Sequence, residues 1–546
     1  MKNAETAGTI KNQIILTILT VALAVLILCP VAMLFIGNKS WSVLAEKENF
    51  QMILNSLYLG ISVVIVSTLI AFPLAFIFSK TTFAKYKFAD VVFMIPFMTP
   101  PYIASMGWIL FMQKRGLLQQ LLPFTKGWEN CFFSFKGLVL VMSLHVFPFM
   151  YTMLKNAMLN IPQSLDEAAS VFGAKFFRRL RKVNIPLLLG NYAIAALLVF
   201  VKTLSEYGTP ATLGRRIGFD VFTIQIHRYA TVAPVNFDKA SALSAVLTLI
   251  CIFMWAMQNL ITEKSRWNLV GTRTARTGYK KLKFLPSLIC KIYIVVVIFF
   301  AIIIPYFSII STSLIKLQGF GLKAGNFSFM NYVMLFTENQ KAIKALLNSL
   351  FLAVVSATIC AVLGTLICIT IFSSKSKLKK VTEGISLLPE MLPGIVLVLG
   401  IMIFWNRLYK VVPLYNTMGI MVLAYVVLFL PYTIQYVNSS LSQISGNLIS
   451  AGKVFGASNS FLFRKITLPL IMSGIAVGWM MTFIISFREL VTASLIAPPN
   501  VLVVSTFITR EFEQGSVSSG MAMAVICVLF TTTALLVLNY FTKRKK

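Results

Sequence analysis

Long apolar stretches, separated by short polar segments, recur along the whole of this 546-residue chain. An α-helix needs about 20 apolar residues to cross the hydrocarbon core of a bilayer, and each stretch reaches that length. The pattern predicts an all-α polytopic membrane protein with twelve transmembrane helices, near residues 14–36, 53–79, 88–112, 137–159, 185–206, 239–262, 285–312, 345–373, 381–406, 415–438, 467–487 and 519–541.

The composition supports a membrane protein. Hydrophobic residues make up 58% of the chain, charged residues 12%, and the mean hydropathy is +0.83. A water-soluble domain could not cover so much apolar surface. The first stretch, 14–36, is long for a signal-peptide core and lacks a convincing small-residue cleavage site, so we expect a retained span.

The formal net charge is +32, which in a soluble protein would suggest a nucleic-acid partner. Here the basic residues gather between apolar stretches, so no nucleic-acid partner is expected. Basic loops of membrane proteins stay in the cytoplasm. Every basic cluster falls on one side of the twelve-span arrangement, which predicts that both termini are cytoplasmic; the clusters lie at 80–87, 175–182, 264–283, 375–380 and 543–546.

The chain contains an internal repeat. Segments recur at an offset of 293, Asn55–Leu59 with Asn348–Leu352 and Ile95–Pro100 with Leu388–Pro393, and at an offset of 283, Val171–Ala174 with Val454–Ala457. The ten-residue difference lies in a longer outer loop of the first half, around 113–136. Both copies begin on the same side, so the repeat is parallel, and the halves are expected to enclose a pathway at their interface.

Matched prolines occur in spans three and nine. Proline removes a backbone donor and loosens a helix, and such breaks are tolerated in a membrane where they line a cavity. We therefore predict that these prolines border the pathway: Pro96, Pro100, Pro389 and Pro393. The alternative is that membrane helices simply tolerate proline.

The loop after span four predicts a short helix of its own. Ser164 precedes Glu167 by three residues, the spacing of a capping box. Small residues follow at 168–170, and Gly173 can adopt the positive φ that ends a helix. Pro186 then begins the next span, where its missing N–H costs nothing.

This loop resembles the signature of ABC-importer permeases of the type I, binding-protein-dependent family, which reads E-A-A, three residues, Gly, nine residues, then I-x-L-P. The second half carries a degenerate copy at the equivalent place. The matching residues are Ser164, Glu167, Ala168, Ala169, Gly173 and Pro186, then Ser450, Ala451, Gly452, Gly456 and Pro469. The resemblance implies two coupling helices that dock nucleotide-binding subunits, unequally because Ser450 replaces the glutamate. Alternatively, Glu167 only caps its own helix.

Three further segments resemble one permease subgroup whose fused two-copy members are associated with ferric iron: 203–210, 486–492 and 504–512. Relatives move thiamine, polyamines, phosphonates or sugar phosphates, so these remain alternatives. The resemblance implies a prokaryotic inner-membrane permease. Its expected divisions are 1–49, first span and outer loop; 50–262, first repeat core; 263–284, basic linker; 285–343, seventh span and outer loop; 344–541, second repeat core; and 542–546, basic tail.

The expected partners are two ATPase subunits, an extracytoplasmic substrate-binding protein and the lipid bilayer. No P-loop is present, so this chain is not expected to be an enzyme; ATP and Mg²⁺ belong to the partners. Two histidines and seven cysteines without C-x-x-C spacing predict neither a metal nor a disulfide framework. A major-facilitator transporter also has six plus six spans, but its glycine–acid–basic signature is missing from 79–88.

Two acids occupy matched positions near the outer ends of spans five and eleven. Glu206 and Glu489 are separated by 283 residues, and Arg488 adjoins the second. These residues are candidates for the pathway, where carboxylates could guide a cation. Alternatively, Lys202 and Arg488 simply satisfy them.

Overall fold

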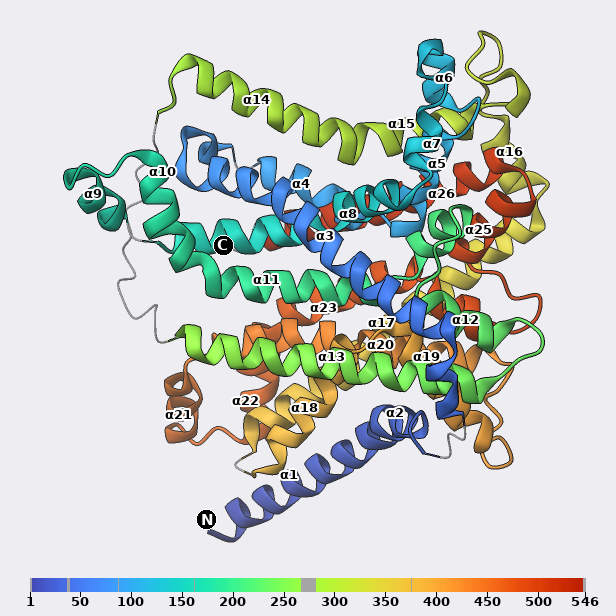
Figure 1. The fold of residues 1–546 in the computed structure, drawn as a ribbon. Coiled ribbons are helices and arrows are strands. Elements are labelled where there is room, and N and C mark those ends of the chain that lie inside the picture. The colour runs from blue at the N-terminus through green and yellow to red at the C-terminus, as the bar shows by residue number, and fades with distance from the viewer. Residues whose placement is uncertain are drawn as a thin grey trace. The chain divides into compact units, whose positions relative to one another are not determined.

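A computed structural model describes residues 2–36, 40–86, 88–161, 163–266, 281–374 and 376–543 (Figure 1). Within these ranges ten helices are long and apolar enough to cross a membrane, or twelve if two bent helix pairs each count as one span. This confirms the predicted all-helical polytopic fold. Parts of the basic clusters lie outside the described residues: Lys87, Lys375, 267–280 and 544–546.

The chain forms two compact units, and each is built around the core of one repeat. The first-repeat unit comprises Leu44–Gln225 and Leu249–Phe329. The second-repeat unit comprises Met1–Val43, Ile226–Thr248 and Met330–Lys546. Helices α12 (Phe222–Thr231) and α13 (Phe237–Arg266) run across this division.

In the first-repeat unit, α3 packs against α8 and α11. Its helices are α3 (Lys47–Lys80), α4 (Phe88–Met98), α5 (Pro101–Met112), α6 (Leu117–Leu121), α7 (Trp128–Phe132), α8 (Phe135–Leu159), α9 (Gln163–Val171), α10 (Phe176–Arg179), α11 (Ile185–Ser205), α14 (Phe284–Ile298) and α15 (Ile304–Leu314).

In the second-repeat unit, α17, α20 and α23 pack on one another in the corresponding way. Its helices are α1 (Lys2–Leu23), α2 (Cys29–Met33), α16 (Met330–Thr337), α17 (Gln340–Ser373), α18 (Leu378–Met391), α19 (Gly394–Arg407), α20 (Met418–Leu441), α21 (Gly446–Val454), α22 (Asn459–Leu462), α23 (Leu468–Phe487), α24 (Val491–Ile496), α25 (Val504–Gln514) and α26 (Val517–Lys543).

The leading span of each repeat packs on the core of the other repeat. Helix α1 lies along α18, and α2 crosses α19, both within the second-repeat unit. In the first-repeat unit, α15 crosses α5 and α14 touches α3. The compact units therefore divide the chain differently from the order of residues along it.

Both crossings depend on a glycine that lets two backbones touch. A Cβ added at Gly107 of α5 would lie 2.7 Å from the carbonyl oxygen of Pro305. A Cβ added at Gly400 of α19 would lie 2.6 Å from the carbonyl oxygen of Pro30. Small residues allow such close approach between membrane helices. The two glycines are separated by the repeat offset of 293, so both copies use the same contact.

The spans predicted at 88–112 and 381–406 are broken. Helices α4 and α5 meet at 87°, and α18 and α19 at 113°. The breaks fall directly before α5 and α19, at Pro100 and Pro393, while Pro96 and Pro389 lie buried inside α4 and α18. Pro100 and Pro393 therefore mark the interruption of these spans in both repeats, whereas Pro96 and Pro389 are accommodated within a helix; whether the prolines border a pathway stays a prediction.

The Asn-Ser pair that recurs in α3 and α17 forms hydrogen bonds to a loop of the same unit. Asn55 donates to the Asp220 carbonyl (3.1 Å), and Ser56 accepts from the Phe222 amide (2.9 Å). In the second-repeat unit, Asn348 donates to the Leu502 carbonyl (2.9 Å) and Ser349 accepts from the Val504 amide (2.8 Å). The motif thus satisfies backbone groups that a helix cannot reach, as a bilayer requires.

We predict that Gly107→Ala and Gly400→Ala each destabilise the protein by roughly 1–3 kcal/mol, because the added methyl overlaps a helix backbone. The matched control is Gly384→Ala in α18, whose Cβ would meet no atom within 4 Å. Thermal unfolding in detergent checks this. Equal midpoints for all three variants would contradict the proposed role of the glycines.

Candidate functional site

The loop after α8 forms the predicted short helix, α9, which projects from the ends of α8 and α11 (Figure 1). Gly173 has φ +76°, in the left-handed region. Around it, the Ala174 amide donates to the Ala169 carbonyl (3.0 Å) and the Phe172 amide to that of Ala168 (3.1 Å). This confirms that glycine ends the helix through its positive φ.

The degenerate second copy folds in the same way. Helix α21 ends at Gly456, with φ +78°. The Ala457 amide donates to the Gly452 carbonyl (3.0 Å), and the Phe455 amide to that of Ala451 (3.1 Å). The second loop therefore keeps the same backbone conformation although its residues 450–452 depart from the signature.

The structure explains one of those departures. A Cβ on Gly452 would lie 2.4 Å from Cδ2 of Leu462, a buried side chain on α22. The first loop has Ala169 and Arg179 at these two positions. The second loop therefore packs a leucine into the space that a methyl group occupies in the first.

Four of the remaining signature residues are exposed on the two surface helices: Glu167, Ala168, Ser450 and Ala451. Pro186 was expected to begin its span, but that span already starts at Leu180, and Pro186 follows the π-helical turn Leu180–Asn184. Pro469 likewise follows the π-helical turn Phe463–Thr467, inside a span that starts at Phe463. The side chain of Ser164 lies outside the described residues.

The most exposed apolar side chains of the two loops were not among the predicted site residues. Val171 is 85% exposed and Phe172 90%; the equivalent Val454 and Phe455 are 84% and 89% exposed. Large apolar groups left so open at the same place in both copies make these loops a candidate protein-binding surface. The Val-Phe-Gly-Ala sequence, which recurs in both halves, was the sequence feature that could have identified these residues. We call these four residues the Val-Phe tips.

A second feature is an exposed polar face on α8 and on α20. Among the described spans these two are the most enclosed by protein. Their exposed residues nevertheless include polar side chains at matching positions: Thr152, Asn156 and Asn160, and Gln435, Ser439 and Gln443. Four-residue spacing places the first two residues of each set on one helix face, and Asn160 and Gln443 follow just beyond the helix ends. Because polar groups at membrane depth face water or protein rather than lipid, these faces are candidate pathway walls.

Glu206 and Glu489 act locally as helix caps. Glu206 follows α11, and its carboxylate accepts from the Thr209 amide (3.1 and 3.0 Å). Glu489 follows α23 and accepts from the amides of Val491 and Thr492 (both 2.8 Å). Backbone amides therefore satisfy both acids, whereas Lys202 lies 6.0 Å from the centre of the Phe149 ring. Arg488 occupies the C-cap of α23. A pathway role for these residues stays a prediction.

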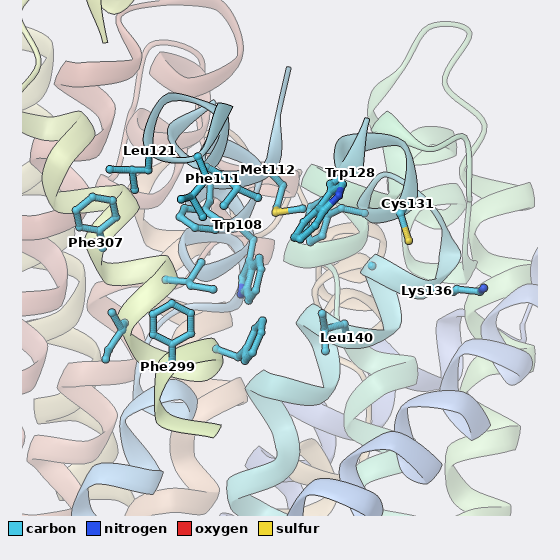
Figure 2. Close-up of a pocket in the computed structure, with 17 residues that line it drawn as sticks. Trp108, Phe111, Met112, Leu121, Trp128, Cys131, Lys136, Leu140, Phe299 and Phe307 are labelled. Atoms are coloured by element: carbon cyan, nitrogen blue, oxygen red, sulfur yellow. The ribbon is translucent and has the colours of Figure 1, made fainter. Parts of the chain in front are cut away.

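A large cavity of the first-repeat unit is apolar (Figure 2). It measures about 980 Å³ and is walled by Trp108, Trp128 and Phe299 among others. Lys136 is its only charged lining residue, and its amine points away from the cavity in Figure 2. This cavity therefore offers a cation neither a carboxylate nor an imidazole ligand. Within the described ranges, no group of three His, Cys, Asp or Glu residues could hold a metal ion.

The structure thus contains a helical membrane bundle built twice, with a glycine-stopped surface helix and an exposed polar face in each copy, an arrangement that suits a transport permease. The chain belongs to the family described as the binding-protein-dependent transport system inner membrane component, whose model matches residues 71–267 and 359–546. Family membership confirms the predicted class, places the chain in the inner membrane and excludes the major-facilitator alternative.

Relatives include the ferric transport system permease protein FbpB of Actinobacillus pleuropneumoniae, 24% identical over 91% of this chain and 72% of the relative. The spermidine/putrescine transport system permease protein PotC of Haemophilus influenzae is 27% identical over 46% of this chain and 94% of the relative. Among solved structures, a bacterial ABC transporter involved in the import of the acidic polysaccharide alginate is 21% identical, covers 48% of this chain and 96% of its own, and has a TM-score of 0.37.

We predict that Gly173→Val and Gly456→Val each disrupt the end of a surface helix, because a β-branched residue with positive φ costs roughly 1–3 kcal/mol. Both sites have open space around the Cβ position, so the effect would be conformational rather than steric. Asn tolerates this backbone, so Gly→Asn is the matched control. Amide hydrogen exchange of α9 and α21 measures the outcome, and equal protection in the Val and Asn variants would contradict it.

Proposed function

We propose that this chain is the permease subunit of an ATP-driven importer and that α9 and α21 each dock one nucleotide-binding ATPase subunit. The observation that carries the proposal is the pair of Val-Phe tips, displayed at the same place on two surface helices of one chain. Because one chain supplies both helices, it would assemble with two ATPase subunits. ATP and Mg²⁺ would bind those partners, and this chain would hydrolyse nothing.

The proposed orientation places α9, α21 and both termini in the cytoplasm, because the basic clusters gather there. An extracytoplasmic binding protein would deliver cargo to the opposite side. ATP-driven closure of the two ATPase subunits would then move α9 and α21 and change access between the two sides. The proline breaks in spans three and nine would border the path, together with Glu206, Glu489 and Arg488.

The proposed cargo is ferric iron. It is supported by the likeness over most of the chain to a permease named for ferric transport. The second candidate is a polyamine, because a spermidine/putrescine permease matches about half of the chain. Both cargoes are cations, which suits a path with acidic and amide side chains.

We predict that Phe172→Ala and Phe455→Ala each weaken one ATPase contact by about 10- to 100-fold, since burying a phenylalanine contributes about 1.5–3 kcal/mol. Native mass measurement of the detergent-solubilised complex should find two ATPase subunits with the wild type, one with each single variant and none with the double variant. Phe124→Ala, at another exposed phenylalanine, is the control. Two copies of this chain per complex would refute the fused-permease proposal.

Cargo is tested in proteoliposomes that contain this chain and its ATPase, with the binding protein outside. We expect ATP-dependent uptake of radiolabelled ferric iron and no uptake of radiolabelled spermidine. Uptake of spermidine alone would replace the cargo and keep the permease assignment. A third outcome is that the wild-type protein assembles with an active ATPase and imports neither compound. That result would rule out both proposed cargoes.

A further inference from the structure

Glu390 and Gln435 form a polar pair within the second-repeat unit. Glu390 lies one residue before the end of α18, directly before the break at Leu392–Pro393. The Gln435 side-chain amide, from α20, donates to the Glu390 carboxylate. Both side chains are exposed although they belong to apolar membrane helices.

The pair lies within the membrane-spanning part of the unit. Gln435 precedes the end of α20, at Leu441, by six residues, which is about 9 Å along the helix. A carboxylate facing lipid at such depth is costly, and acids in spans normally face protein or a water-filled cavity. Gln435 and Ser439 lie on one exposed polar face of α20, and the exposed Gln443 follows two residues beyond the end of the helix. This continuity indicates that Glu390 faces water.

The first repeat has no such pair. At the same offsets, Phe97 stands where Glu390 stands and Thr152 where Gln435 stands. The Phe97 ring packs on the rings of His145 and Phe149, with ring centroids 5.8 Å and 4.7 Å apart, respectively. The acid–amide pair is therefore not required by the shared fold of the repeats.

The acid at the start of α4 in the first repeat is neutralised, whereas Glu390 is not. Asp90 forms an ion pair with Lys155 (2.6 Å) and accepts a hydrogen bond from Tyr151 (2.6 Å). Within the part of the chain that the structure describes, Glu390 forms no ion pair, and its hydrogen-bond partner is a neutral amide. Glu390 therefore leaves a negative charge on a water-facing surface.

We propose that Glu390 and Gln435 form a transient cation site on the path, next to the break between α18 and α19. The inference rests on the proposed function, in which a cation passes through this chain. An arriving cation would accept a carboxylate oxygen of Glu390 as ligand and displace the amide donor. Gln435 can then present its amide oxygen, because the group carries both a donor and an acceptor.

A site with only two protein oxygens, from Glu390 and Gln435, suits a cation that passes through rather than one that is held. A hard cation prefers oxygen ligands, and a trivalent ion needs several of them to be held. The remaining ligands would be water, so the ion would be attracted to the site and released from it. The negative charge of Glu390, more than the length of its side chain, would then control the uptake of the cation.

The test compares Glu390→Gln and Glu390→Asp in the proteoliposome system, with radiolabelled ferric iron as the probe and ATPase rate as the second readout. Glu390→Gln should lower uptake per ATP about tenfold, the equivalent of about 1.4 kcal/mol, while ATPase rate and subunit mass stay at wild-type values. Glu390→Asp keeps the charge and should retain most uptake. Glu338→Gln, an exposed acid on the same unit, is the neutral control.

Unchanged uptake per ATP in Glu390→Gln, or an equal loss in the Gln and Asp variants, would overturn the cation site while the importer proposal stands. A wild-type chain that imports no cation at all would instead overturn the proposed function. If Glu390→Gln fails to assemble, Gln435→Leu replaces it as the test. That change removes the amide oxygen and keeps the carboxylate, and unaltered uptake would refute a ligand role for Gln435.

Discussion

Hydrocarbon offers no hydrogen bonds, so every backbone group of this chain that a helix leaves open must find a partner inside the protein. The interrupted segments follow this constraint closely. Glu206 and Glu489 accept from the amides that begin the helices after them. Ser56 and Ser349 accept from amides at the starts of α12 and α25. The irregular parts of the fold are therefore held by a few polar side chains, and these recur in both repeats.

Comparison of the two repeats separates residues that hold the fold from residues free to change. The close contacts of Gly107 with Pro305 and of Gly400 with Pro30 are the same contact made twice. Charged contacts differ: Lys155, which pairs with Asp90, corresponds to Asn438 in the second repeat. The residue at Glu390 differs as well, because Phe97 stands at the equivalent position of the first repeat. The shared fold does not require residues that differ in this way, so cargo selection is best sought among them.

Much of the fold follows from the sequence because apolar length and glycine position act locally. Twelve apolar stretches indicate the spans, and the spacing around Gly173 and Gly456 predicts two stopped surface helices. The packing of α1 and α14 on the core of the opposite repeat could not be predicted. Hydropathy shows that a helix is apolar, but it does not show which other helix its apolar surface contacts. The matched prolines indicated that these two spans are loosened, but the bend angles of 87° and 113° could not be predicted, since hydropathy runs unbroken through both breaks.

The site was predicted only in part for a related reason. The signature identified the surface helices, but it does not show which side chains remain uncovered, so the Val-Phe tips emerged only from burial. Matched acids suggested Glu206 and Glu489 for the path. Their carboxylates cap the following helices, a local role that a one-dimensional pattern does not reveal, and the pathway role stays a prediction. Glu390 lacks a matched partner in the first repeat, and a search for symmetry passes over it.

The proposed docking helices lie close along the chain to the helices that carry the polar faces. Helix α8 ends at Leu159 and α9 begins at Gln163, while α20 ends at Leu441 and α21 begins at Gly446. On the other side, the π-helical turn of each loop is the first turn of the next span. A movement of α9 or α21 would, under the proposed function, pass to these neighbouring helices. Under the proposed function, ATPase closure would act first on α8 and α20, whose polar faces border the path.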